Sequence, residues 1–126
     1  MESEKAGGVL NFRELVVWQK GISLAKEIYT LTGAFPQQES FGLVSQMRRA
    51  AVSIPSNIAE GQVRQHKPDF VRFLYISLGS LAEIETQIIL SQELGYLQAP
   101  KAEKVMPLIL EIRKMLYGLI KSLPNR

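Results

Sequence analysis

The chain has 126 residues, of which 46% are hydrophobic and 21% are charged, and its formal net charge is +3. This length and balance are typical of one globular domain with a buried core, and they exclude a disordered chain. The sequence contains no cysteine. Disulfides, thiolate catalysis and cysteine-based zinc or iron–sulfur sites are therefore excluded.

The N-terminal segment MESEKAGG carries acidic residues and no apolar h-region, so it is not typical of a signal peptide. No apolar run approaches the roughly 18 to 20 residues that a membrane span requires. From both observations we expect a cytoplasmic protein that has no membrane partner.

The first predicted helix covers about residues 12–32 and stops at Gly33, with Pro36 close behind. Its apolar residues form two seams at helical spacing. One consists of Leu15, Trp18, Ile22, Ala25 and Tyr29, and the other of Val17, Leu24, Ile28 and Leu31. A bundle core needs only one wide apolar stripe per helix, so this helix has more apolar surface than a single core requires.

The second predicted helix covers about residues 40–60, with Ser40 as N-cap and Gly61 just past its C-terminal end. Pro55 lies inside it and predicts a bend. The expected buried stripe is Leu43, Met47, Ala50, Ala51, Ile54 and Ile58.

Two further helices are predicted at about residues 68–94 and 101–123. Pro68 and Pro100 suit their first turns, and Gly95 ends the earlier one. Short loops between long helices favour antiparallel neighbours. The sequence therefore predicts one all-α domain over residues 10–123, an up-down-up-down antiparallel four-helix bundle, with flexible tails at 1–9 and 124–126.

The last helix also carries two apolar seams, and the surplus on the first and last helices predicts an association surface. We expect a homo-oligomer. The candidate interface residues are Val17, Leu24, Tyr29, Met106, Tyr117 and Ile120.

A polar line follows the second helix beside its buried stripe: Gln46, Arg49, Ser53, Asn57 and Glu60. Antiparallel packing on the next helix would place Arg49 near Glu83 and Glu60 near Arg72. Two hypotheses follow. The groups form an inter-helix network that fixes the register of the bundle, or they line a cleft or ring lumen and contact a ligand.

Basic residues are concentrated in two segments. Residues 41–72 hold five Lys/Arg against two Asp/Glu and residues 101–126 hold six against two, whereas residues 73–100 hold three Asp/Glu and no Lys/Arg. Charge complementarity between helices is one explanation, and phosphate contacts to RNA or DNA are the other. The candidate nucleic-acid contacts are Arg48, Arg64, Lys67, Arg72, Lys101, Lys104, Arg113, Lys114 and Lys121.

Catalytic and metal-binding patterns are not found. The single histidine, His66, falls in a predicted loop, and the Glu-x-x-His pairs of di-metal bundles are missing. Ser53 and Ser56 have no histidine base on their helix. We expect no enzyme, no cofactor or metal, and no small-molecule substrate.

Three segments carry a family resemblance: FRELVVWQKGISLAKEIY, FPQQESFGLVSQMRRAAVSIPSNIAEG and DFVRFLYISLGSLAEIETQIILSQELGYL. Over roughly residues 11–120 the chain resembles the bacterial ribosomal-RNA intervening-sequence protein family, with the NIAEG box and SLAEIETQ as the most specific parts. The resemblance implies a four-helix bundle that assembles as a ring-like homopentamer, and it points to Arg49, Ser53, Asn57, Glu60 and Glu83. It implies no enzymatic activity.

A more distant resemblance is to the accessory protein of diversity-generating retroelements. That protein is a basic, pentameric four-helix bundle that binds nucleic acid and a reverse transcriptase. The resemblance therefore adds nucleic-acid binding to the expected functions, although this chain lacks the strongly basic character.

Overall fold

The computed structural model describes residues 11–123, and within them every regular element is helical. The predicted tails at residues 1–9 and 124–126 lie outside the described residues. Four long helices are joined by short loops and accompanied by two single 3-10 turns. In chain order the elements are η1 (Phe12–Glu14), α2 (Val16–Thr32), η2 (Gln37–Glu39), α3 (Leu43–Val63), α4 (Lys67–Glu93) and α5 (Ala99–Ser122).

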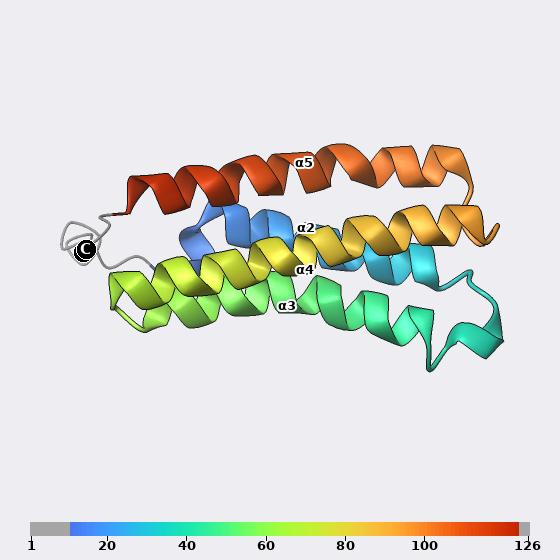
Figure 1. Ribbon diagram of the computed structural model, residues 1–126, viewed down its shortest axis with the longest axis horizontal. Helices are drawn as coiled ribbons and strands as arrows, with labels where there is room; N and C mark the ends of the chain where they lie inside the picture. Colours follow the sequence, from blue (N-terminus) through green and yellow to red (C-terminus); the bar gives the residue numbers. More distant parts are fainter. Residues whose placement is uncertain (1–10, 124–126) are drawn as a thin grey trace.

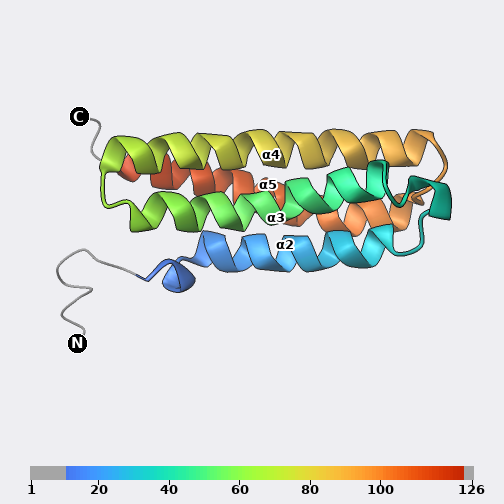
Figure 2. The same cartoon turned by 90° about the horizontal axis from the view of Figure 1, so that it is seen from below.

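The four helices run along one long axis, and each is antiparallel to the helix before it (Figures 1 and 2). Helix α3 packs between α2 and α4, and α5 closes the bundle against α4 and α2. The predicted up-down-up-down four-helix bundle is confirmed. Its assembly into a ring stays a prediction.

The core consists of the predicted stripe of α3 and matching stripes of the other helices. All six expected α3 residues are buried, from Leu43 to Ile58. Helix α5 contributes Val105, Ile109, Ile112 and Leu116, and α4 contributes Leu74, Leu81, Ile84 and Ile88. The predicted buried stripe of α3 is therefore confirmed, and the buried residues of α4 and α5 follow the same spacing of three and four residues.

The first long helix begins later than predicted. The side chain of Asn11 accepts a hydrogen bond of 2.9 Å from the backbone N–H of Arg13 and starts the short turn η1. Leu15 then takes an extended conformation, with φ −74° and ψ 123°, and interrupts the helix. The predicted helix over 12–32 is therefore a 3-10 turn followed by α2.

The predicted roles of the two apolar seams of α2 are corrected by the structure. Val17 and Leu24 were expected in an oligomer interface, but they are 5% and 0% exposed and belong to the core. The cause is the close approach of α2 to α3 at Gly21, where an added Cβ would lie 3.4 Å from the ring of Pro55. This contact turns the seam with Leu24 inward and leaves Ile22 and Tyr29 outside.

The ends of α3 also differ from the prediction. Ser40 is not its N-cap, because the helix begins at Leu43, whose backbone N–H donates to Glu39 Oε1 at 3.2 Å. Gly61 does not end the helix. It lies buried within the last turns of α3, where Phe70 and Phe73 of α4 pack directly against it.

Helices α4 and α5 begin and end within two residues of the predicted bounds. Gly95, with φ +81°, follows α4 in the left-handed conformation that glycine favours. At the same end of the bundle, Tyr96 donates a hydrogen bond of 3.0 Å to Glu39 Oε2. This bond, with smaller contributions from burial and from the negative charge of Glu39, raises the pKa of Tyr96 above 10.0. The bond ties the loop after α4 to the loop before α3.

Candidate functional site

The predicted polar line lies on the surface of the α3–α4 pair. Gln46, Arg49, Glu60 and Glu83 are exposed, and Ser53 and Asn57 are half-buried. The groups are therefore solvated to a large extent, and they do not form a buried ionic network.

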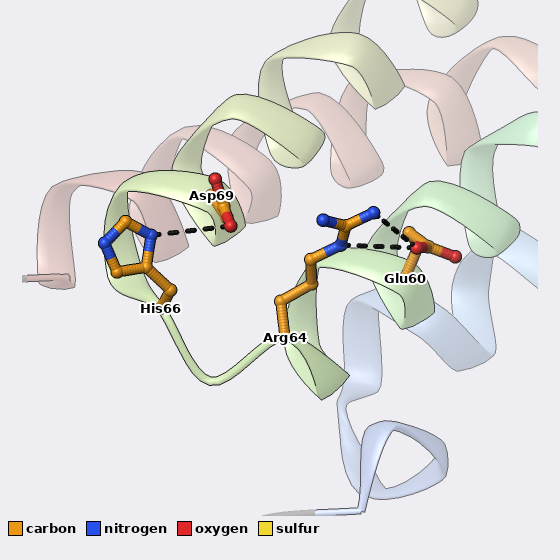
Figure 3. A network of polar contacts seen from close by, with 4 residues as sticks. All are labelled: Glu60, Arg64, His66 and Asp69. Carbon is orange, nitrogen blue, oxygen red and sulfur yellow. Dashed lines mark hydrogen bonds and ion pairs between the residues drawn. The ribbon is translucent and has the colours of Figure 1, made fainter.

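Neither predicted ion pair forms. Arg49 donates to Ser45 Oγ at 3.4 Å, and among residues 11–123 no ion pair joins it to Glu83. Glu60 pairs with Arg64 on its own helix at 3.0 Å, as Figure 3 shows. The reason is that α3 continues past Gly61, which places Arg64 one turn after Glu60 on the same face.

The turn between α3 and α4 holds a second short-range pair. His66 Nδ1 lies 3.4 Å from Asp69 Oδ2, and the histidine side chain is 65% exposed (Figure 3). His66 is thus a solvated residue before α4, as the sequence indicated. Arg72, the predicted partner of Glu60, instead places its guanidinium 4.6 Å from the centre of the Phe73 ring.

Small hydroxyl side chains make the polar contacts between α3 and α4. Ser53 donates to Ser80 across the two helices, and Ser77 donates to the carbonyl of Ile54 at 3.0 Å. Asn57 stays within α3, donating to the carbonyl of Ser53 at 2.8 Å. The inter-helix role of Ser77 was not predicted, although its spacing of three and four residues from the apolar Leu74 and Leu81 was the available signal.

A small cavity of about 220 Å³ lies between the two helices beneath the polar line. It is lined by Gln46, Arg49, Ala50, Ser53 and Glu83. Nearby, the Gln87 side chain is buried, and its Nε2 donates to Glu83 Oε2 at 3.5 Å. Gln87 Oε1 has no hydrogen-bond partner within residues 11–123.

A larger open groove of about 710 Å³ lies over the outer side of α3, and we call it the α3 groove. Its lining residues are Tyr29 of α2, Ser40 and Phe41 of the preceding loop, and Val44, Ser45, Arg48, Arg49, Val52, Ser53, Ser56 and Asn57 of α3. The Phe41 side chain is 99% exposed. The groove combines aromatic and aliphatic groups with two arginines and contains no carboxylate among its lining residues.

Several candidate phosphate-binding cations are already engaged within the chain. Arg48 donates to Thr32 Oγ1 at 2.9 Å and to the carbonyl of Tyr29 at 3.2 Å. Arg113 pairs with Glu85, and Arg64 pairs with Glu60. Among the nine candidates, the exposed cations for which the described residues provide no ion pair are Lys67, Arg72, Lys101, Lys104, Lys114 and Lys121.

The outer face of α4 is an apolar surface that was not predicted from the sequence. Tyr75, Ile76, Ile89 and Leu90 are all exposed on it, at 40–52%. Within the described chain, α4 is the one helix long and apolar enough to cross a membrane by length and composition. The sequence-based expectation that the chain has no membrane-spanning segment came from the length of its uninterrupted apolar runs. Core helices pass the same test, but only 39% of the most apolar stretch of α4 is buried.

The remaining predicted interface residues lie on two different helices. Tyr29 and Tyr117 are about half exposed, on α2 and α5 respectively. Met106 and Ile120 are partly buried and pack against the core. The exposed apolar surface therefore includes residues of α2 and α5, from which it was predicted, and also the outer face of α4.

Metal chemistry has no obvious site in the part of the chain that the structure describes. Over residues 11–123, no group of three or more His, Cys, Asp or Glu side chains is arranged to hold a metal ion.

Comparison with known proteins identifies the family. The family model described as 23S rRNA-intervening sequence protein matches residues 13–118. A similar solved structure is a protein with unknown function from the S23 ribosomal protein family of Bacteroides thetaiotaomicron VPI-5482. It shares 27% identity over 90% of this chain and 100% of its own, with a TM-score of 0.78. No curated protein matches. Since the match spans most of the bundle, the chain belongs to the 23S rRNA-intervening sequence protein family.

Proposed function

We propose that this chain is a cytoplasmic, non-enzymatic scaffold protein that assembles with copies of itself, with five subunits favoured. The observation that carries the proposal is the exposed apolar surface of the bundle, which includes the outer face of α4. Large apolar patches on soluble proteins mark association sites. The family resemblance to ring-like pentamers supports the same assembly.

Self-assembly also accounts for the composition of α4. A helix that is half exposed on a lone bundle normally carries charged residues on its outer side. Between Tyr75 and Leu90, however, the exposed residues of α4 include a single charged side chain, that of Glu83. An assembly that covers this face would remove its apolar side chains from water, which contributes about 25 cal/mol for each Å².

Sedimentation velocity of the wild-type chain tests the proposal. At micromolar concentration we expect a single species several times heavier than the 14.2 kDa protomer, because apolar surface of this extent favours association. Native mass spectrometry then gives the subunit number. A 14.2 kDa particle as the only species at this concentration would contradict the proposal.

Nucleic-acid binding is the alternative function, and the exposed lysines favour it. Lys101, Lys104, Lys114 and Lys121 all lie on α5 without an ion pair among the described residues, and an oligomer would present several copies of them. Phosphate contacts need only such cations, and repeated patches add avidity.

A titration of structured RNA by fluorescence anisotropy tests this alternative. Since phosphate binding releases counterions, the affinity should fall at least about tenfold between roughly 50 and 200 mM salt. A Lys114→Ala/Lys121→Ala variant should bind more weakly with a smaller salt dependence, while Lys26→Ala on α2 serves as the control. If no RNA or DNA binds even at low salt, the alternative is wrong and the scaffold function stands alone.

A further inference from the structure

Two exposed surfaces of this chain are complementary in shape and charge. The α3 groove is concave, apolar and basic, whereas the outer face of α4 is convex and apolar, with Glu83 as its one charged side chain. We propose that the outer face of α4 from one copy docks into the α3 groove of the next copy. This inference rests on the proposed self-assembly and specifies the two surfaces that make it.

The α4 side of the contact is a ridge at helical spacing. Its exposed residues are Tyr75, Ile76, Gly79, Ala82, Glu83, Thr86, Ile89 and Leu90. They extend over about 22 Å at 1.5 Å per residue. Gly79 and Ala82 keep the middle of the ridge low. Among residues 11–123, and apart from the adjoining residues and backbone of its own helix, no atom lies within 4 Å of a Cβ added at Gly79, so the small residue is not required by packing inside the bundle.

The groove side offers apolar groups from α3 and from the loop before it. Phe41 is 99% exposed and Val52 is 42% exposed. Full exposure of a phenylalanine leaves its ring in water with no compensating contact in the chain. Aromatic anchors that fill a partner's surface dominate protein interfaces. A second copy that covers Phe41 and Val52 would bury both.

The arginines of the α3 groove favour a partner surface that carries a carboxylate. The groove contains Arg48 and Arg49, and no carboxylate lines it. Arg48 is held by Thr32 and Tyr29, but within residues 11–123 Arg49 makes only one long hydrogen bond, to Ser45. Residues 73–100 contain three carboxylates and no Lys or Arg. Because Glu85 is paired with Arg113, Glu83, which accepts one long hydrogen bond from Gln87, is the carboxylate of this face that can approach Arg49 of the neighbouring copy.

The contact is heterologous, because the two surfaces belong to different elements of the chain. Each copy then uses its groove for one neighbour and its α4 face for the other. Contacts of this kind close into rings when the rotation permits and continue as filaments when it does not. The arrangement differs from a symmetric dimer, in which the same patch meets itself.

A mixing experiment with two variants tests the pairing. The groove variant is Phe41→Ala/Val52→Lys, and the face variant is Ile89→Lys/Leu90→Lys. All four side chains are exposed, so each variant should keep the circular dichroism spectrum of the wild type. Alone, each should associate at least about tenfold more weakly than the wild type and sediment as a monomer. Mixed in equal amounts, they should form a one-to-one dimer through the one intact groove and the one intact face.

The control is Val16→Lys, an apolar-to-lysine change of similar exposure on α2, outside the groove and α4. It should assemble like the wild type. Phe41→Ala alone provides a milder groove variant whose removed side chain has no role in the fold.

The outcomes separate this inference from the proposed function. A monomeric wild type contradicts self-assembly itself. If the wild type assembles but the groove variant assembles equally well, the proposed pairing is wrong and α4 meets another surface. A mixture that stays monomeric while both single variants are folded also overturns the pairing.

Discussion

Replacing Gly61 by alanine should lower the free energy of unfolding by about 1–3 kcal/mol, because the position has no room for a methyl group. An added Cβ would lie 2.7 Å from Phe73 Cβ, 3.0 Å from Phe70 Cδ1 and 3.3 Å from Phe70 Cα. Two of these atoms are backbone or directly attached to it, so α4 itself must move away from α3. Urea denaturation monitored by circular dichroism measures the loss.

Gly118→Ala is the matched control, since Gly118 is also a glycine within a helix. Within the described residues, no atom beyond the adjoining residues and backbone of its own helix lies within 4 Å of a Cβ added at this position. Alanine there should stabilise the chain by about 0.5–1 kcal/mol, because glycine loses more conformational freedom on folding. If Gly61→Ala also stabilises the chain, the close approach of α3 and α4 is not the reason for glycine at this position.

The glycine of the NIAEG segment therefore has a packing role. From the sequence alone it was predicted to end the helix, which is the commonest use of glycine at such a position. The residues that overturn this prediction, Phe70 and Phe73, lie beyond the turn. The residue pattern of one helix gives no information about the distance between that helix and the next one. Only the packing of α4 against α3 shows why Gly61 cannot carry a side chain.

The buried faces of α3, α4 and α5 could be predicted because they depend on local spacing. Residues such as Met47, Ile84 and Ile109 recur every three or four positions, and the helix then fixes the face they share. The rotation of α2 could not be predicted in this way. Its two seams are about equally apolar, and the contact between Gly21 and Pro55 decides which of them faces the core.

The residues of the polar line could be identified from the sequence, but the contacts that they make could not. The ion pairs assumed a hairpin with its centre near Arg64. Because α3 continues to Val63, Arg64 is instead one helical turn from Glu60 and pairs with it. A long charged side chain can form an ion pair with any of several residues within its reach. A shift of a few residues in the position of the turn therefore changes which ion pair forms.

The exposed face of α4 was missed for a different reason. The sequence of a helix with apolar residues on two sides has the same pattern whether the second side packs against its own bundle or against another molecule. Burial separates the two cases, since Leu81 and Ile84 are fully buried while Ile89 and Leu90 are about half exposed. Exposure of this second side is the observation from which the assembly is proposed.

The largest effect is expected for Leu24→Ala, which should lower the free energy of unfolding by about 2–5 kcal/mol. Leu24 is fully buried in the core, and its truncation leaves a cavity. Ile22→Ala, two residues earlier on the same helix, removes a side chain that is 37% exposed and should cost about 1 kcal/mol or less. Both variants must be compared at one protein concentration, because association adds to the apparent stability of a self-assembling chain.

The pair of variants decides which seam of α2 belongs to the core and which is free to meet a partner. If Leu24→Ala melts like the wild type while Ile22→Ala is strongly destabilised, α2 is rotated relative to the described bundle. In that case Tyr29, which lies on the same seam as Ile22, would turn inward. The α3 groove would then lose one of its walls, and the docking of a neighbouring α4 would lose its site.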